Sequence, residues 1–383
     1  MHRINAVFQD YAWGSRSFIQ NFLKLPQEGP IAEAWYSAHP KAPSLVNGFP
    51  FTELITADPV YWLGSPQGDF PFLLKILAAD EALSIQVHPS KQQAEEGFRA
   101  ENLKGVPQNS PIRNYKDSNH KPEMMLALTD FSALCGIRRF PGIVAAFQDL
   151  GLSRFFRSFT EFQHKQDSAS FCTLYQEVLH KEKLPGLHEH LHTLPESEPW
   201  KDEIQWIKKL IEQYPEDRSV VSPLLLNLIH LKPMEALFLD AGIVHAYLHG
   251  AGIEIMAQSD NVLRAGLSPK HIDVPELLKI MQKQPYSPLL YPAAPGINMW
   301  HYYPVPVPDF LLSRIQLDGN TTLPQIPGPK ILMCIEGSVF AQGATGEMHL
   351  HQADSAIIPA AEPNAILSGK GHIVLASCGN LPS

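Results

Sequence analysis

The chain has 383 residues, of which 44% are hydrophobic and 18% charged, a balance typical of a well-packed globular protein and not of a disordered one. A chain of this length predicts two or three domains. The formal net charge of −9 excludes a general electrostatic attraction to nucleic acid or to anionic lipid. An anionic ligand would therefore require a local cluster of Lys and Arg.

The N-terminal segment has no basic region followed by an apolar stretch, so it does not resemble a secretory signal. No run approaches the roughly 18 apolar residues of a membrane-spanning helix. The cysteines show no paired spacing, which indicates free thiols in a reducing compartment; they are Cys135, Cys172, Cys334 and Cys378. We expect a cytoplasmic protein with neither a membrane nor a nucleic-acid partner.

Residues 1–140 contain short apolar runs that are broken by turn residues. Two strands are predicted at 71–79 and 82–89, and a strand pair at 124–138. Short strands at this spacing are typical of a sandwich or a barrel.

The segment 141–229 changes to helical periodicity. Its best-defined helix is predicted at 203–214, where Ile204, Ile207, Leu210, Ile211 and Tyr214 share one face. Ser197, Pro199 and the acidic residues that follow are typical of a helix start, and Pro215 ends the pattern.

Strands return from residue 230, first at 234–242 with a tight turn at Gly242. We predict a first β domain from residues 1–140 and 230–295, a helical insertion at 141–229, and a second, metal-free β domain at 296–383.

Gln86 and His88 are two residues apart, so in a strand both side chains would project from one face. For this pair alone, an exposed strand face is the simpler interpretation. Glu123 ends the charged run 115–123 and begins the apolar strand that follows it. That run could be solvated surface, but a carboxylate drawn into the interior needs a cation or a metal.

The fourth candidate ligand, His245, follows a Gly242-x-x-His turn, a common ligand position in double-stranded β-helices (cupins) but a weak pattern on its own. Together, two imidazoles and one carboxylate suit a divalent metal such as zinc. Since Gln86 would be a neutral ligand, the metal would keep a net positive charge and its Lewis acidity.

In the segment 253–266 apolar and polar residues alternate at first, which is consistent with a half-exposed strand followed by a polar turn. Arg264 favours a different interpretation, because an acidic protein needs cations around a phosphate. The available cations are Arg264, Lys270, Lys121 and Lys75.

At these residues the chain resembles the type I mannose-6-phosphate isomerases. The run 115–123 fits the pattern Y-x-D-x-N-H-K-P-E at every fixed position. The run 245–270 fits the family's second long pattern, except that Ser268 replaces the usual Thr. The segments 11–15, 32–40, 70–77 and 83–89 resemble other family segments in the expected order.

The resemblance implies a mainly β fold of cupin-type (jelly-roll) domains with an inserted helical domain. It implies one Zn²⁺ per chain bound by Gln86, His88, Glu123 and His245, with Arg264 as the active-site arginine. Substrate-pocket positions fall on Lys75, Ser84, His120, Lys121, Glu254, Asp260 and Lys270.

The implied reaction interconverts mannose 6-phosphate and fructose 6-phosphate through a cis-enediol. The base remains open among His120, Lys121 and Asp260. The expected partner is a small sugar phosphate, and the expected state is a monomer. Alternatives are an isomerase of another aldose phosphate, a non-catalytic sugar-phosphate sensor, and a structural β-sandwich.

Two histidine groups are not predicted to bind metal. His349 and His351 have the spacing of a strand pair but no accompanying Glu or Gly-x-x-His turn. At helical pitch His188, His190 and His192 scatter around the helix, so we expect them to be solvated.

Overall fold

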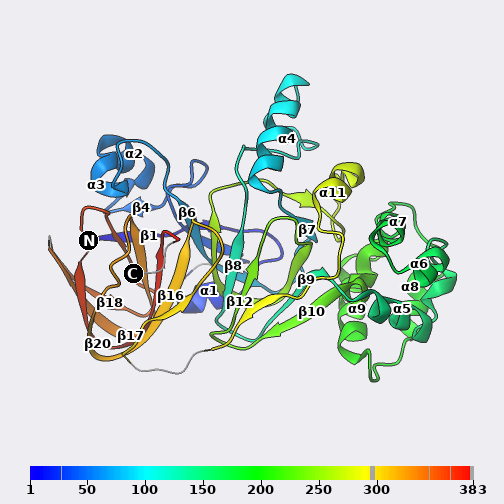
Figure 1. Ribbon diagram of the computed structural model, residues 1–383. Helices are drawn as coiled ribbons and strands as arrows, with labels where there is room; N and C mark the ends of the chain where they lie inside the picture. The colour runs from blue at the N-terminus through cyan, green and yellow to red at the C-terminus, as the bar shows by residue number, and fades with distance from the viewer. Residues whose placement is uncertain (27, 294–297, 345, 363, 380–383) are drawn as a thin grey trace.

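The computed structural model describes residues 1–26, 28–293, 298–344, 346–362 and 364–379. These residues form two antiparallel sheets, of nine and eleven strands, with helices at the periphery (Figure 1). In the eleven-stranded sheet seven strands follow in order: β14 (Leu289–Tyr291), β11 (Ala236–Leu239), β8 (Glu123–Ala127), β12 (His245–Ala257), β6 (Phe72–Ala79), β3 (Glu33–Tyr36) and β2 (Val7–Gln9). A branch through β12 adds β7 (Gln86–Val87), β9 (Phe131–Ile137), β10 (Leu226–Leu231) and β13 (Leu263–Arg264).

Strand β12 belongs to two layers. Its first residues pair with β7 and β9, and from Gly250 onward it pairs with β6 and β8. The exchange of partners occurs at Gly250, whose φ of +120° favours glycine; a Cβ there would lie 2.6 Å from the carbonyl oxygen of Asp130. The branch therefore forms a second layer facing the first, as in a jelly roll.

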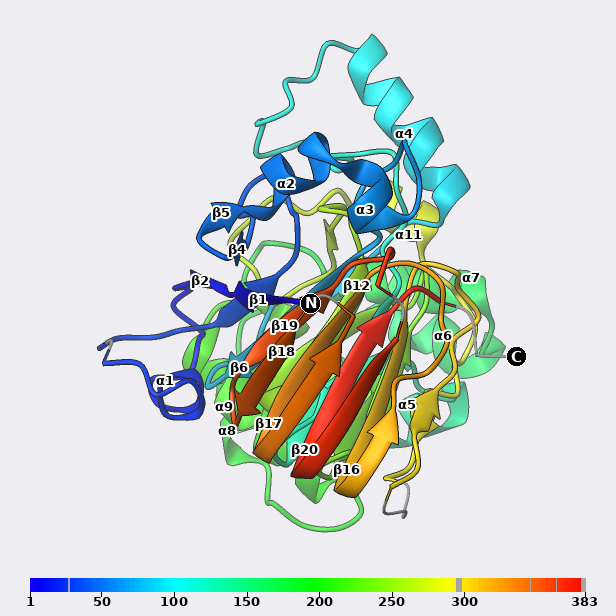
Figure 2. The same cartoon turned by 90° about the vertical axis from the view of Figure 1, so that its left-hand side faces the viewer.

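The nine-stranded sheet packs on the outer face of the first layer. Its order is β15 (His301–Tyr303), β16 (Leu311–Thr322), β20 (Ala365–Ser377), β17 (Lys330–Gly343), β19 (Ser355–Ile358), β1 (His2–Asn5), β4 (Leu45–Val46) and β5 (Phe49–Pro50), with β18 (Glu347–His351) on β17. Figure 2 shows β16, β20 and β17 side by side. Buried side chains such as Ile76, Ile253 and Leu312 form one core between the two sheets.

Strand β1 pairs with β19 and with β4, which places residues 2–5, 45–46 and 49–50 in the C-terminal sheet and not in the first domain as predicted. The cause is a pairing between segments about 350 residues apart, which no local pattern specifies. The remaining domain boundaries stay a prediction.

The helices between β9 and β10 pack against the second layer through a shared apolar core (Figure 1). They are α5 (Phe140–Asp149), α6 (Phe159–Lys165), α7 (Ser168–Val178), α8 (Leu187–Thr193), α9 (Lys201–Gln213) and α10 (Ser222–Leu225). The predicted helix 203–214 is confirmed as α9. Ser197 does not cap it, because the helix begins after Trp200 and Ser197 lies in the preceding turn.

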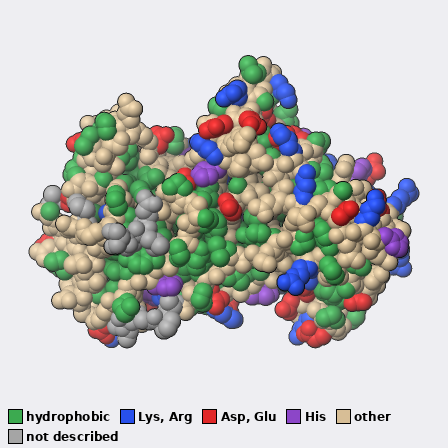
Figure 3. Space-filling view, viewed as in Figure 1, with side chains coloured by type: hydrophobic (Ala, Val, Ile, Leu, Met, Phe, Trp, Pro, Cys, Tyr) green, Lys and Arg blue, Asp and Glu red, His purple; other side chains and the backbone are tan. Residues whose placement is uncertain are grey.

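Five further helices flank the sheets: α1 (Phe18–Phe22), α2 (Phe51–Ala57), α3 (Pro59–Leu63), α4 (Lys91–Leu103) and α11 (Val274–Ile280). In Figure 3, charged side chains of both signs gather on α4 and on the helices at the right. Among the described residues, none of these helices is long and apolar enough to cross a membrane.

The predicted strands at 71–79 and 124–138 are confirmed, but the strand at 82–89 is reduced to Gln86–Val87. The reason is that the backbone N–H groups of this segment donate to different parts of the chain. The N–H of Leu83 donates to the carbonyl oxygen of Tyr247, and the N–H of Ile85 donates to that of Gly266.

The two histidine groups that were not predicted to bind metal differ in their exposure. His349 and His351 are exposed, as is His192. His188 and His190 are half-buried, because their rings bond to the carbonyl oxygens of Asp217 and Leu150 at 3.3 and 2.6 Å. For these two residues the expectation of solvation was wrong.

Candidate active site

A cavity of about 680 Å³ lies between the two layers of the jelly roll, within the size range of small-molecule sites. Its walls include inward-facing residues of the first layer, namely Glu33, Trp35, Lys75, Glu123 and Glu254. The second layer and the loops around it contribute Ser84, Gln86, Asp260, Arg264 and Lys270. Nearly all the predicted pocket residues therefore line one cavity.

Three buried ligand atoms converge in this region. Nε2 of His88 and Nε2 of His245 lie 3.3 and 3.4 Å from the two oxygens of Glu123, and all three side chains are 1% exposed. Among the described residues, neither imidazole Nε2 has a hydrogen-bond partner, nor has Oε2 of Glu123. Buried polar atoms without partners are rare, and such a set fits a metal ion. Among the described residues, this is the one group of His, Cys, Asp and Glu close enough to bind one.

The outer nitrogens of both imidazoles are held by the backbone. Nδ1 of His88 lies 2.6 Å from the carbonyl oxygen of Asn261, and Nδ1 of His245 lies 2.8 Å from that of Ile243. A ring that donates its Nδ1–H to a carbonyl leaves the Nε2 lone pair free for a metal.

The protonation states also suit metal binding. Burial, and then the charge of Lys121, lower the pKa of His88 to about 4. Burial acts to raise the pKa of Glu123, but Lys121 and His88 outweigh it and hold that pKa well below its usual range. A neutral imidazole and an ionised carboxylate are the forms that bind metals.

Gln86, the predicted fourth ligand, lies directly opposite His245 in the pairing of β7 with β12. Opposite residues of antiparallel strands project from the same face, so the Gln86 side chain lies beside the His245 imidazole. The turn that carries His245 is tied to His88, because the N–H of Gly242 donates to the His88 carbonyl oxygen at 2.8 Å.

A buried ion triad lines the deeper part of the cavity. Nζ of Lys75 lies 2.8 Å from Glu254 and 3.4 Å from Glu33. Burial acts to lower the pKa of Lys75, but the two carboxylates outweigh it and raise that pKa. Trp35 donates its indole N–H to Glu33 at 2.6 Å. This region offers ionised donors and acceptors to a polyhydroxylated ligand.

Replacing Lys75 with Met is expected to destabilise the fold by about 3–5 kcal/mol, because two buried carboxylates lose their cation. The loss should shrink as the pH falls, since burial raises the pKa of Glu254 and a protonated carboxyl no longer needs the cation. Urea unfolding at several pH values would measure it. The exposed Lys270, changed to Met, is the control and should stay within about 0.5 kcal/mol of the parent. A Lys75 variant as stable as this control would contradict the prediction.

Two cations occupy another part of the wall. Arg264 donates from Nη1 to Ser84 Oγ at 2.5 Å, and the Lys270 side chain is exposed. The charge of Arg264, and then burial, lower the pKa of Lys270. Two cations this close favour an anion between them. Lys121 also lines the cavity, with Nζ 2.8 Å from Glu123.

The three base candidates occupy different places. Lys121 and Asp260 line the cavity, and Asp260 pairs with Lys41 at 2.7 Å. His120 points away from it: Nε2 lies 3.0 Å from both carboxylate oxygens of Asp309. In this extended segment alternate side chains face opposite ways, so Lys121 and Glu123 face the cavity and His120 faces Asp309, between β15 and β16. The prediction of His120 as a pocket residue was wrong.

Comparison with known proteins agrees with this geometry. Residues 1–140 match the family model described as phosphomannose isomerase type I, catalytic domain. Mannose-6-phosphate isomerase from Escherichia coli (strain K12) is 38% identical over 390 residues, covering 97% of both chains. The chain belongs to the type I phosphomannose isomerase family. A more distant member, mannose-6-phosphate isomerase from Rattus norvegicus, is 32% identical and covers 94% of this chain and 93% of its own.

Solved structures of family members superpose closely. A single-residue variant of phosphomannose isomerase from Salmonella typhimurium gives a TM-score of 0.91 at 36% identity, covering 99% of this chain and all of its own. A mannose 6-phosphate isomerase bound with zinc and yttrium gives 0.90 at 36% identity, with the same coverage. The predicted fold class, mainly β with the cupin fold of this family, is confirmed.

Three cavity residues were missed from the sequence. Tyr247 follows His245 by two residues on β12, and its buried hydroxyl has no hydrogen-bond partner in the described part of the chain. Burial, and then Glu254, raise its pKa well above the usual value, so it remains a donor. Glu33 and Trp35 alternate on β3. The period-2 spacing that relates Gln86 to His88 could have identified all three.

Proposed function

We propose that the chain is a zinc-dependent isomerase that interconverts mannose 6-phosphate and fructose 6-phosphate through a cis-enediol. The observation that carries the proposal is the set of three unpartnered ligand atoms on His88, Glu123 and His245. They lie in a region whose cavity also presents the cations Arg264 and Lys270. When bound, zinc would supply Lewis acidity toward the sugar oxygens.

The other residues of the cavity would bind different parts of the substrate, according to their position in the wall. Lys270 and the Ser84 hydroxyl would bind the phosphate, since this part of the wall concentrates positive charge. Arg264, which bonds to Ser84, would donate to the oxygen on which negative charge develops in the reaction. Lys75 and Glu254 would bind sugar hydroxyls in the deeper part. This division orients the reacting carbons toward the metal ligands.

The proton transfer between the two reacting carbons requires a base that faces the cavity. Lys121 and Asp260 meet this condition, whereas His120 does not. Burial acts to raise the pKa of Asp260, but Lys41 and His39 outweigh it and lower that pKa, so Asp260 is ionised at neutral pH. Lys121 already donates to the metal-ligand candidate Glu123 at 2.8 Å. The Tyr247 hydroxyl is placed to donate to a developing oxyanion.

A two-substrate assay tests the proposal. The zinc-loaded protein should convert mannose 6-phosphate to fructose 6-phosphate at least about tenfold faster, in kcat/KM, than it converts glucose 6-phosphate, a discrimination that a few hydroxyl contacts can supply. Equal or faster turnover of the glucose compound would favour an isomerase of another aldose phosphate. Thermal stabilisation by mannose 6-phosphate without turnover would favour a sensor. The monomeric state and cytoplasmic location remain predictions.

A further inference from the structure

We propose that Asn261 is a positioning residue that fastens the metal ligand His88 to the chain segment leading to Lys121 and Glu123. The inference rests on the proposed metal site but not on the identity of the sugar. Asn261 is fully buried in the turn between β12 and β13. Its backbone carbonyl oxygen is the partner of His88 Nδ1 at 2.6 Å.

The side chain of Asn261 binds a different part of the chain. Its Oδ1 accepts the backbone N–H groups of Lys116 and Asp117, at 2.7 and 3.2 Å. Its Nδ2 donates to the carbonyl oxygens of Asp117 and Asn119, at 2.9 and 2.8 Å, and to Asp117 Oδ1 at 3.1 Å. Both ends of the amide are therefore fully used.

The carboxylate of Asp117 in turn accepts hydrogen bonds from the turn that contains Asn261. It accepts the Asp260 backbone N–H at 2.7 Å and the Ser259 hydroxyl at 2.9 Å. Side chains from both segments, 116–119 and 259–261, therefore join the two. Segment 259–261 contains the carbonyl that holds His88. Segment 116–119 leads within four residues to Lys121 and Glu123.

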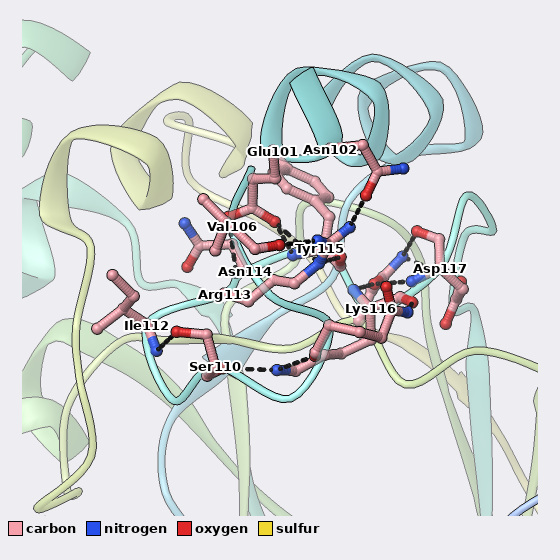
Figure 4. A network of polar contacts seen from close by, with 12 residues as sticks. Glu101, Asn102, Val106, Ser110, Ile112, Arg113, Asn114, Tyr115, Lys116 and Asp117 are labelled. Carbon is pink, nitrogen blue, oxygen red and sulfur yellow. Dashed lines mark hydrogen bonds and ion pairs between the residues drawn. The ribbon is translucent and has the colours of Figure 1, made fainter. Parts of the chain in front are cut away.

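The outer part of the same segment is held by α4, as Figure 4 shows. The Glu101 carboxylate accepts the N–H groups of Asn114 and Tyr115 at 3.0 and 2.9 Å, and Arg113 donates to Asn102 Oδ1 at 2.6 Å. This anchorage fixes the segment to the helix, whereas the contacts of Asn261 fix it to the metal ligand. Asn261 therefore has a role distinct from general loop stability.

The hydrogen bond to Asn261 fixes the orientation of the His88 imidazole. The Asn261 carbonyl selects the tautomer that has its proton on Nδ1, so the Nε2 lone pair is directed toward Glu123 and the metal site. Partners of this kind typically change metal affinity by about 10–100-fold when they are lost. Without its side-chain amide, the turn can shift, and the carbonyl no longer holds the ring at a fixed angle.

The test compares Asn261→Ala with Asn119→Ala. Asn119 lies in the same segment, but its amide donates to the Gln258 carbonyl and accepts from Lys91, away from His88. Zinc affinity is measured by competition with a chromophoric chelator, and ligand geometry by the visible spectrum of the Co²⁺-substituted protein. We expect Asn261→Ala to bind zinc about 10–100-fold more weakly, with an altered Co²⁺ spectrum, lower kcat and little change in KM. Asn119→Ala should match the parent.

A second variant covers the case in which Asn261→Ala does not fold. Asn261→Ser keeps a short hydroxyl that can replace at most part of the amide's hydrogen bonds, so it should show the same changes in smaller degree. Equal zinc affinity and Co²⁺ spectra in parent, Asn119 and Asn261 variants would overturn the inference. A parent protein that itself binds no zinc would overturn the proposed function instead.

Discussion

Replacing His245 with Ala is expected to remove the metal and the activity together. The variant should lose most of its zinc on dialysis, and turnover of mannose 6-phosphate should fall at least about 10²-fold, since even outer partners of a metal ligand are worth about 10–100-fold in affinity. The reason is that the His245 Nε2 is one of three unpartnered atoms that converge in the site. Elemental analysis and initial rates on the same preparation would measure both effects.

The matched control is His249→Ala. His249 lies four residues further along β12 and is exposed, so its loss should leave zinc content and turnover unchanged. Circular dichroism must show that both variants are folded. A His245 variant with a full equivalent of zinc and the turnover of the control would show that this imidazole is not a ligand.

The ligand set illustrates what the sequence can specify. The period of two predicts that Gln86 and His88 share one face, although the regular strand ends at Val87. It could not pair them with His245, because that contact depends on β7 lying beside β12 across about 160 residues. Only the resemblance of the long motifs to a known family placed Glu123 and His245 in the same set.

His120 shows where local reasoning fails. It lies within the most specific motif, between Asn119 and Lys121, yet its partner Asp309 is 189 residues away, between β15 and β16. The prediction for strand β1 was wrong for the same reason, because its pairing with β19 joins segments near opposite ends of the chain. Which side chain of an extended run faces a cavity, and which faces another domain, depends on packing that the run does not encode.

The charged residues of the cavity differ in whether they have a partner of opposite charge, and this difference concerns Arg264. The deeper wall contains the Lys75 triad, in which each charge has a buried partner. By contrast, the ion pairs of the described residues include none for Arg264, which is partly exposed and bonds to the neutral Ser84. A cation without a carboxylate can compensate the charge of a ligand. Among the described residues, Arg264 has no hydrogen bond or ion pair to His88, Glu123 or His245.

Replacing Arg264 with Ala should therefore leave zinc bound and lower kcat by about 10²–10³-fold, the usual effect of losing one donor to a developing negative charge. Zinc content, kcat and KM for mannose 6-phosphate would be measured together. Arg157→Ala, on the exposed surface of the helical block, is the control for loss of an arginine.

These three measurements separate three possible roles of Arg264. A fall in kcat with zinc retained supports a role in the transition state. A rise in KM at unchanged kcat would restrict Arg264 to binding the phosphate. Near-normal rates would show that the catalytic assignment is wrong, because the arginine would then contribute only its hydrogen bond to Ser84.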